Sequence, residues 1–292
     1  MRKIAVVTDT TCDLPPEMLN DYNIVLASMK VHFGEEEYTD QVTMDHAQFY
    51  QKMVENPDIL PRTTQPQTKD FLEIYRRLGK EGYSTIFSLH ISSKMSGTIQ
   101  AANVAAGMLE EMDIIPIDTG QVGPALGVFI YLVAEKMKQG PDKEELKAFV
   151  EKLVQQSDAI LEIFTVNTME YLVKNGRVGK AKGFAAGLLN IKPILTLKNG
   201  EITPLDKVRG KKALLEKISR LALDRIKKCR KPVLSLSWGD ESMEENVEAI
   251  YKKIENEYGK SLQVIRCRIS PTVGCHAGPE VFSLAVADMS FC

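Results

Sequence analysis

The feature of this sequence that most limits its fold is a repeated order of short apolar run, polar loop and amphipathic helix in the N-terminal half. Apolar runs at 4–7, 84–89 and 114–117 have the length of buried strands, and a loop rich in hydroxyl or carboxylate side chains follows each of them. Strands that alternate with helices favour a parallel sheet, in which the carboxyl ends of the strands share one edge. Because ligands bind beyond that edge in open α/β sheets, these loops are the first candidates for a binding site.

The loop between the strand at 84–89 and a helix predicted at 98–109 contains the main candidate, Ser96. Gly97 lets the backbone approach a bound group, and the free N–H groups at the positive end of a helix favour an anion. Alternatively, Ser96 only caps the helix, which is the usual role of serine at such a position. Other hydroxyl groups lie in the same loop or follow the next strand, and they belong to Ser93, Thr98 and Thr119.

Two further loops have polar side chains that a purely structural role would also explain. In the segment 60–66, prolines flank Thr63 and Thr64, which predicts an extended stretch rather than a helix. Threonines at such a place can simply bond to neighbouring backbone. Asp9 and Asp13 follow the first strand and could bind a metal ion, but such carboxylates more often cap and brace a turn. From the residues alone we favour the structural role at both places.

The pattern changes after residue 156. Asn199 and Gly200 separate two apolar runs, which is a strong signal for a β-hairpin and therefore for antiparallel strands. We predict an α/β protein of two domains. The N-terminal α/β/α domain, residues 1–156, has a parallel sheet, and the C-terminal α/β domain, residues 157–292, has a mixed sheet.

The remaining elements are predicted from periodicity and from the residues that start and stop helices. Ser242 and Glu245 have the spacing of a capping pair at the start of a helix, and 271–279 is expected to be a turn rich in glycine and proline. Further strands are predicted at 24–27, 30–33, 159–166, 191–197, 201–209, 233–238, 262–269 and 281–287, and further helices at 45–53, 71–78, 142–154, 169–173, 182–189 and 211–228.

Composition and charge argue against several classes of protein. The net charge of −2 gives no basic field for a nucleic acid. Five cysteines without C-x-x-C or Cys/His ligand spacing favour a reduced cytoplasmic protein without a structural metal. The first apolar run is too short for a signal peptide. The longest apolar run, 125–134, is too short to span a bilayer. It is apolar on all sides, which predicts a helix buried inside the protein.

His276 stands out among the histidines because it lies in a stretch of glycine and proline after a predicted strand. It could bond to a ligand, but a histidine that bonds to local backbone fits the sequence equally well. A serine together with a histidine also permits a Ser/His-dependent acyl hydrolase. We discount this enzyme because no motif places a carboxylate that could orient the histidine.

The whole chain resembles the DegV family of bacterial fatty-acid-binding proteins, on motifs that are individually weak but occur in order. They are T-D-T-T-C-D-L-P at 8–15, T-T-Q-P at 63–66, S-S-K-M-S-G-T at 92–98, G-R-V-G at 176–179, K-P-I-L at 192–195, K-V-R-G-K-K-A at 207–213 and H-A-G-P at 276–279. The resemblance implies two α/β domains with a fatty acid between them and its tail in an apolar tunnel. It implies that Thr63 and Ser96 bind the carboxyl group and that His276 belongs to the same hydrogen-bond network. The surrounding pocket loops would then contain Thr64, Ser93, Gly97, Thr98 and Thr119.

The resemblance also implies a surface for a partner protein. Lys207 and Arg209 match a basic segment near the mouth of the tunnel, where a fatty acid kinase would dock, and Arg177 is a further candidate at the mouth. The segment 207–212 places basic side chains at the start of a predicted helix, where the helix dipole favours acidic ones. This arrangement opposes the local electrostatics, so it supports a role in docking an acidic partner or, transiently, a membrane surface.

These expectations combine into one predicted function. The protein would be a cytoplasmic, non-catalytic carrier that presents a long-chain fatty acid such as palmitate to a kinase, which forms acyl phosphate for phospholipid metabolism. Burial of an acyl chain contributes about 0.8 kcal/mol per methylene, so the tail should dominate the affinity and the carboxyl group should set the orientation. We expect neither a cofactor nor a metal. The alternatives are the acyl hydrolase and a carrier of another small anionic metabolite.

Overall fold

The computed structural model describes residues 3–156, 159–184 and 191–292. In its N-terminal half lies a parallel sheet, whose strands in spatial order are β2 (Ile24–Ala27), β1 (Lys3–Asp9), β6 (Tyr83–His90) and β7 (Asp113–Asp118). Asp9 pairs with Ala27, and His90 pairs with Asp118, so the carboxyl ends of these strands meet at one edge. The predicted parallel sheet is confirmed.

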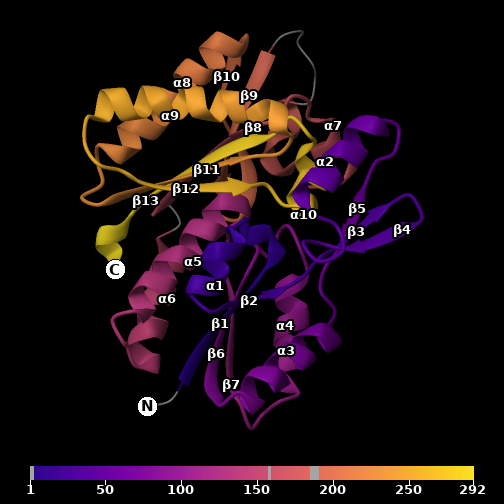
Figure 1. The fold of residues 1–292 in the computed structure, drawn as a ribbon, viewed down its shortest axis with the longest axis vertical. Helices are drawn as coiled ribbons and strands as arrows, with labels where there is room; N and C mark the ends of the chain where they lie inside the picture. The colour runs from indigo at the N-terminus through magenta and orange to yellow at the C-terminus, as the bar shows by residue number, and fades with distance from the viewer. Residues whose placement is uncertain (1–2, 157–158, 185–190) are drawn as a thin grey trace.

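Helices cover both faces of the parallel sheet, which occupies the lower half of Figure 1. They are α1 (Pro16–Asp21), α3 (Thr68–Lys80), α4 (Thr98–Gly107), α5 (Gly123–Met137) and α6 (Lys143–Gln155). Successive side chains of a strand point to opposite faces. Val7 and Ile86 therefore pack with α3 and α4, whereas Val6 and Phe87 pack with α5. This half has the predicted α/β/α layers.

The C-terminal half contains a mixed sheet, whose strands in spatial order are β10 (Glu201–Arg209), β9 (Ile191–Lys198), β8 (Ile160–Thr165), β13 (Phe282–Asp288), β11 (Pro232–Trp238) and β12 (Gln263–Arg268). Neighbouring strands are antiparallel except β11 and β12. Asn199 and Gly200 join β9 to β10 with φ of 52° and 76°, so the predicted hairpin and mixed sheet are confirmed. Helices α8 (Lys211–Ile226) and α9 (Glu244–Tyr258) cover one face of this sheet.

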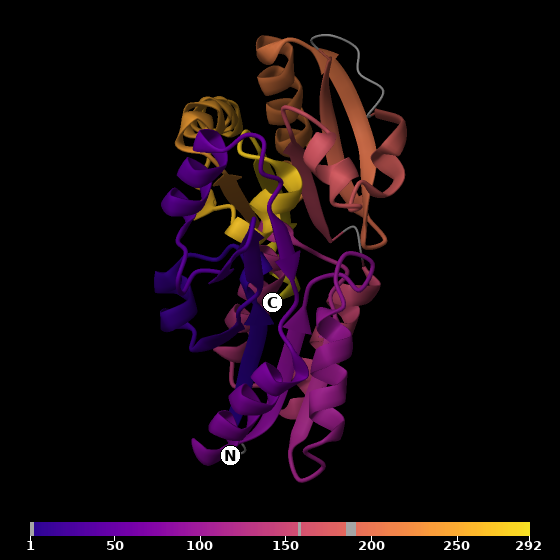
Figure 2. The same cartoon turned by 90° about the vertical axis from the view of Figure 1, so that its right-hand side faces the viewer.

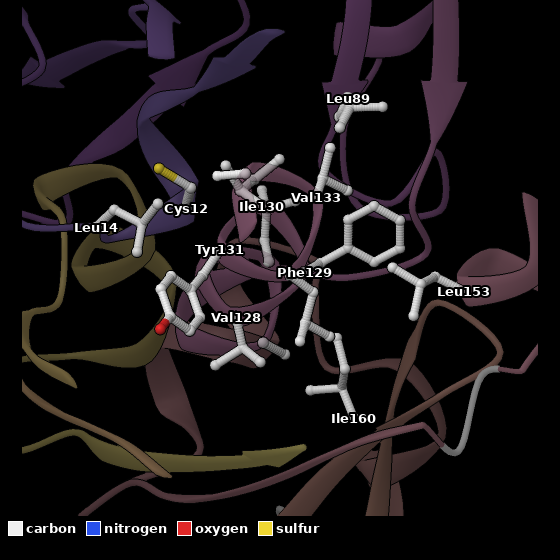
Figure 3. Packing of buried hydrophobic residues seen from close by; sticks show 14 of the residues in the cluster. Cys12, Leu14, Leu89, Val128, Phe129, Ile130, Tyr131, Val133, Leu153 and Ile160 are labelled. Atoms are coloured by element: carbon white, nitrogen blue, oxygen red, sulfur yellow. The ribbon is translucent and has the colours of Figure 1, made fainter. Parts of the chain in front are cut away.

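Helix α5 packs against both sheets at once. Its side chains share a core with Leu89 of the parallel sheet and with Ile160 of the mixed sheet, and Figure 3 shows both residues around Phe129 and its neighbours. Every residue of α5 from 123 to 134 is buried, which confirms the predicted all-round burial. Figures 1 and 2 show the parallel sheet in the lower half of the molecule and the mixed sheet in the upper half, and Figure 1 shows α5 where the two halves meet. The predicted domain boundary at 156/157 stays a prediction, because a shared core does not mark it.

A small antiparallel sheet links the two halves. Its strands in spatial order are β4 (Glu36–Thr39), β3 (Lys30–Phe33) and β5 (Arg62–Thr64), and the neighbouring helices are α2 (His46–Glu55) and α10 (Pro271–Ala277). The Tyr50 hydroxyl on α2 donates to the Ile269 carbonyl oxygen at 3.1 Å, and the Thr272 N–H on α10 donates to Asp40 at 3.2 Å. These hydrogen bonds join α2 and the segment after β4 to the C-terminal half, and α10 also contacts β5 (Figure 1).

Two local predictions are wrong. The stretch 271–279 is largely helical, because Pro271 takes the first position of α10 and the Ser270 hydroxyl caps it. Ser242 does not cap α9, since Met243 stands at the N-cap, while Asp240 caps the short 3-10 helix Glu241–Met243.

Short elements complete the described chain. They are α7 (Glu170–Lys174) and the 3-10 helices Thr10–Cys12, Gly179–Phe184 and Met289–Phe291. Of the helix predicted at 182–189, the residues from 185 onward lie outside the described part of the chain. Among the described helices, none combines the length and the apolar character that crossing a membrane requires.

Candidate ligand-binding cavity

A cavity of about 300 Å³ lies between the parallel and the mixed sheet. The start of α5 at Gly123 and Pro124 contributes to its wall. Apolar side chains come from both halves of the protein, and they include Met29, Ile91, Met95, Phe164, Ile202 and Val281. A cavity with such a lining and a few polar side chains suits a small ligand with a substantial apolar part.

Thr63 and His276 meet at the wall of this cavity, although they are far apart in the sequence. Thr63 lies on β5, paired with Val31 of β3, and His276 lies in the last turn of α10. The Thr63 Oγ1 is 3.0 Å from the His276 Nε2. Burial, followed by the nearby Arg177 charge, lowers the pKa of His276 to about 4, so the imidazole is neutral at neutral pH. A neutral imidazole and a hydroxyl can bind a carboxyl group without a buried ion pair.

Ser96 also lines the cavity, in the loop between β6 and α4. The alternative role of Ser96 as a helix cap does not apply, because Gly97 is the N-cap of α4 and no side chain caps this helix. The Ser96 Oγ lies 2.8 Å from the Thr98 Oγ1 instead. A Cβ at position 97 would overlap the amide of Gln65, so glycine allows the segment 63–66 to pack on this loop. The two hydroxyl-bearing loops are therefore in direct contact.

The cavity reaches the surface at three exposed residues, Thr64, Gln65 and Arg177, which also line it. The Arg177 guanidinium donates to the carbonyl oxygen of Asn175 at 2.6 Å and to that of Met95 at 3.2 Å. No ion pair within the described part of the chain involves Arg177. A positive charge without a carboxylate partner thus stands at the opening of the cavity, where it can interact with an anionic group.

The other candidates from the sequence lie outside the cavity wall. Thr98 stands behind Ser96, and Ser93 is exposed on the same loop. Thr119 follows β7 and donates its hydroxyl to the His90 carbonyl oxygen at 2.8 Å. Lys207 and Arg209 are exposed on β10 at the edge of the mixed sheet. Of these residues, only Thr98 has a hydroxyl group that contacts the side chain of a cavity residue, Ser96.

The sequence-based candidates do not include five polar residues of the wall, Thr11, Gln65, Glu162, Thr272 and Ser283. Glu162 lies in the middle of the apolar strand β8 and is only 5% exposed. Burial raises the pKa of the Glu162 carboxyl to about 8. A single acidic residue inside an otherwise apolar strand is the signal that could have revealed it, because such residues are rarely buried without a reason.

A Ser–His–Asp chain exists in the protein, but it is not at the cavity. His90 lies 3.0 Å from Asp9 through Nδ1 and 2.7 Å from the Ser88 hydroxyl through Nε2, and all three side chains are fully buried. They stabilise the carboxyl edge of the parallel sheet, where Asp9 also accepts from the Ile91 N–H at 3.0 Å. His276, in contrast, has no carboxylate partner among the described residues. This arrangement disfavours the acyl hydrolase.

Fold and cavity together define a class, an α/β protein that encloses a mainly apolar cavity between a parallel and a mixed sheet, with hydroxyl, imidazole and guanidinium groups in the wall. A family model described as "uncharacterised protein, DegV family" matches residues 3–288. The chain belongs to the DegV family, as the motifs predicted.

Relatives and solved structures agree with this assignment. A DegV domain-containing protein of Halalkalibacterium halodurans is 35% identical over 221 residues, 76% of this chain and 77% of that protein. Protein DegV of Bacillus subtilis is 33% identical over 218 residues, 75% of this chain and 76% of that protein. A structure described as the fatty acid binding of a DegV family protein from Thermus thermophilus has a TM-score of 0.89 at 27% identity, covering 99% of this chain and 100% of that one. DegV of B. subtilis, described as a fatty acid binding protein, has a TM-score of 0.87 at 28% identity, covering 98% and 99%.

Proposed function

We propose that this protein is a non-catalytic carrier of a long-chain fatty acid. The carboxyl group bonds to Thr63 and Ser96, with His276 in the same network, and the acyl chain occupies the apolar part of the cavity. The observation that carries the proposal is the apolar cavity with two contacting hydroxyl-bearing loops in its wall. Two solved DegV proteins similar to this chain are described as binding fatty acids.

The energetics of the cavity support this division of roles. Each buried methylene contributes about 0.8 kcal/mol, so a chain of ten contributes more than several hydrogen bonds together. Hydroxyl groups and a neutral imidazole satisfy a carboxyl group but add no buried charge of their own. The tail therefore determines how tightly the ligand binds, and Thr63 with Ser96 determines which end lies near the opening.

A direct test is the identification of the bound lipid. The protein is purified from its natural host without added lipid, extracted with organic solvent, and the extract is analysed by gas chromatography and mass spectrometry. We expect about one equivalent of long-chain fatty acid per chain. A phosphorylated metabolite in its place would contradict the proposal. Hydrolysis of p-nitrophenyl esters that both Ser96→Ala and His276→Ala abolish would favour the acyl hydrolase instead.

We further propose that a fatty acid kinase phosphorylates the bound carboxyl group in the cytoplasm. The polar part of the wall includes the exposed residues Thr64, Gln65 and Arg177, so a partner active site could reach the carboxyl group there. Arg177, which has no ion-pair partner within the described ranges, could stabilise the added phosphate. Lys207 and Arg209 alternate along β10 on one exposed side and supply a positive surface for docking.

Arg209→Ala should slow acyl-phosphate formation without changing the bound lipid. Charges at the rim of an interface mainly raise the association rate, so we expect the rate at limiting kinase to fall about threefold to tenfold at low salt and the difference to shrink at high salt. The measurement is acyl-phosphate formation by the cognate kinase at two ionic strengths. Lys260→Ala is a matched control, since Lys260 is exposed and precedes β12 at the opposite edge of the mixed sheet.

The two contrary outcomes are informative in different ways. A wild-type rate in Arg209→Ala contradicts the docking surface. Loss of lipid from the purified variant would instead assign Arg209 to the cavity.

A further inference from the structure

Glu162 places a carboxyl group where an acyl chain would offer it no hydrogen-bond partner. It lies in the wall of the cavity, in the interior of β8, between Leu161 and Ile163. The main chain at this position is fixed, because the Glu162 carbonyl oxygen accepts from the Thr196 hydroxyl at 2.6 Å and the strand pairs with β13. The side chain is thus held in the wall by a rigid strand.

Only half of this carboxyl group is satisfied by protein. Its Oε1 accepts from the Ser283 hydroxyl at 3.1 Å, and Ser283 itself lines the cavity from β13. Its Oε2 is buried and has no hydrogen-bond partner among the described residues. No basic side chain of the described chain forms an ion pair with it. One oxygen of the Glu162 carboxyl group, Oε2, is therefore without a hydrogen-bond partner from the described residues.

A second carboxyl group stands nearby. Asp13 accepts from the Ser270 N–H at 2.9 Å through Oδ1, and its Oδ2 is also buried without a partner among the described residues. A Cβ at Gly123 would lie 3.5 Å from the Glu162 Oε1 and 3.6 Å from the Asp13 Oδ2, so both carboxyl groups converge on the start of α5. Burial is the main cause that raises the pKa of each group, and the two charges repel one another.

A hydroxyl group is the ligand chemistry that fits this position. It can donate to the Glu162 carboxyl group when that group is ionised, and it can accept from the group when it is protonated. A methylene can do neither, so a plain acyl chain offers the Glu162 carboxyl group no partner for its unpaired oxygen. Sites that contain a buried hydrogen-bonding group discriminate strongly against ligands that lack its partner.

We propose that Glu162 and Ser283 form a second polar subsite in the cavity, which binds a hydroxyl group on the acyl chain, so that the preferred ligand is a hydroxylated long-chain fatty acid. The subsite rests on the proposed fatty-acid carrier. It adds a requirement on the chain of the ligand, whereas Thr63 and Ser96 concern only the carboxyl group. A ligand with both groups satisfies the polar atoms of the wall at two separate places.

The test compares stearate with a series of monohydroxystearates that differ in the position of the hydroxyl group, by displacement of a fluorescent fatty acid from delipidated protein. We expect at least one isomer to bind the wild type about tenfold more tightly than stearate, which corresponds to about 1.4 kcal/mol. Glu162→Leu should abolish this preference and bind stearate at least as tightly as the wild type does. Glu162→Gln, which keeps a hydrogen-bonding group, should retain part of the preference.

Ser235→Ala is a matched control, because Ser235 is a buried serine on β11 that does not line the cavity. It should keep the wild-type preference. Equal binding of stearate and every isomer by the wild type overturns the subsite alone, as does a preference that survives Glu162→Leu. Failure of every acid to bind the wild type overturns the fatty-acid carrier and the subsite with it.

Discussion

The double variant Thr63→Val/Ser96→Ala should lose most of its affinity for fatty acid and keep its fold. Each lost hydroxyl leaves a buried carboxyl group with one partner fewer, which costs about 1–3 kcal/mol, or about fivefold to 150-fold in the dissociation constant for each substitution. Thr63→Val also removes the partner of the His276 Nε2, so its effect should be the larger. The measurement is displacement of a fluorescent fatty acid, with circular dichroism to check the fold.

Ser93→Ala is the matched control for this pair. Ser93 is exposed on the same loop as Ser96 and lies outside the cavity wall, so its hydroxyl should contribute little to binding. Wild-type affinity in the double variant would end the assignment of the carboxyl site. A loss in Ser93→Ala as large as that in Ser96→Ala would show that the loop acts as a whole and not through one hydroxyl.

Phe129→Ala should lower the free energy of unfolding by about 3–5 kcal/mol, a large fraction of the stability of an ordinary domain. Phe129 is 1% exposed on α5, in the core that contains residues of both sheets (Figure 3). Removal of the ring leaves a cavity in the shared core. Neither sheet can shift to fill this cavity without disturbing the packing of the other sheet. Urea denaturation followed by circular dichroism measures the change in the free energy of unfolding.

Val104→Ala serves as the comparison, because Val104 is on α4 but 55% exposed. Its free energy of unfolding should change by no more than about 0.5 kcal/mol. A loss below about 1 kcal/mol in Phe129→Ala would contradict a tightly packed shared core.

Most helices and strands could be predicted from the sequence, because each depends on a pattern of neighbouring residues. The hairpin at Asn199 and Gly200 depends on two residues that tolerate positive φ, and buried strands depend on short apolar runs. The stretch 271–279 was predicted wrongly because glycine and proline usually indicate a turn. Gly274 is instead required by packing, since a Cβ there would overlap the rings of Phe49 and Tyr50 on α2. Contacts of this kind join distant segments and leave no periodic signal.

The cavity was harder to predict than the fold. Thr63, Ser96 and His276 come from β5, a loop and α10, and no spacing in the sequence relates them. The motifs of the DegV family suggested the three together, and the structure places all three in the wall of one cavity. Glu162 is hard to recognise in the sequence because the apolar run around it dominates the pattern and predicts only a strand. An apolar lining has no motif at all, so the volume and course of the cavity required the structure.

The position of α5 also limits how a ligand can come and go. A cavity between two halves of a protein suggests that the halves separate to admit a ligand. Here, however, α5 is buried against both sheets, and full separation would expose side chains such as Phe129 and Ile130 to water. Each such side chain costs about 1.5–3 kcal/mol to expose, so opening on that scale approaches global unfolding. Ligand exchange should therefore proceed through a local opening between the exposed segments at Thr64 and Arg177, while the two sheets stay packed against α5. A fatty acid would then thread in lengthwise, tail first, and its carboxyl group would be the last part to arrive and the first that a partner meets.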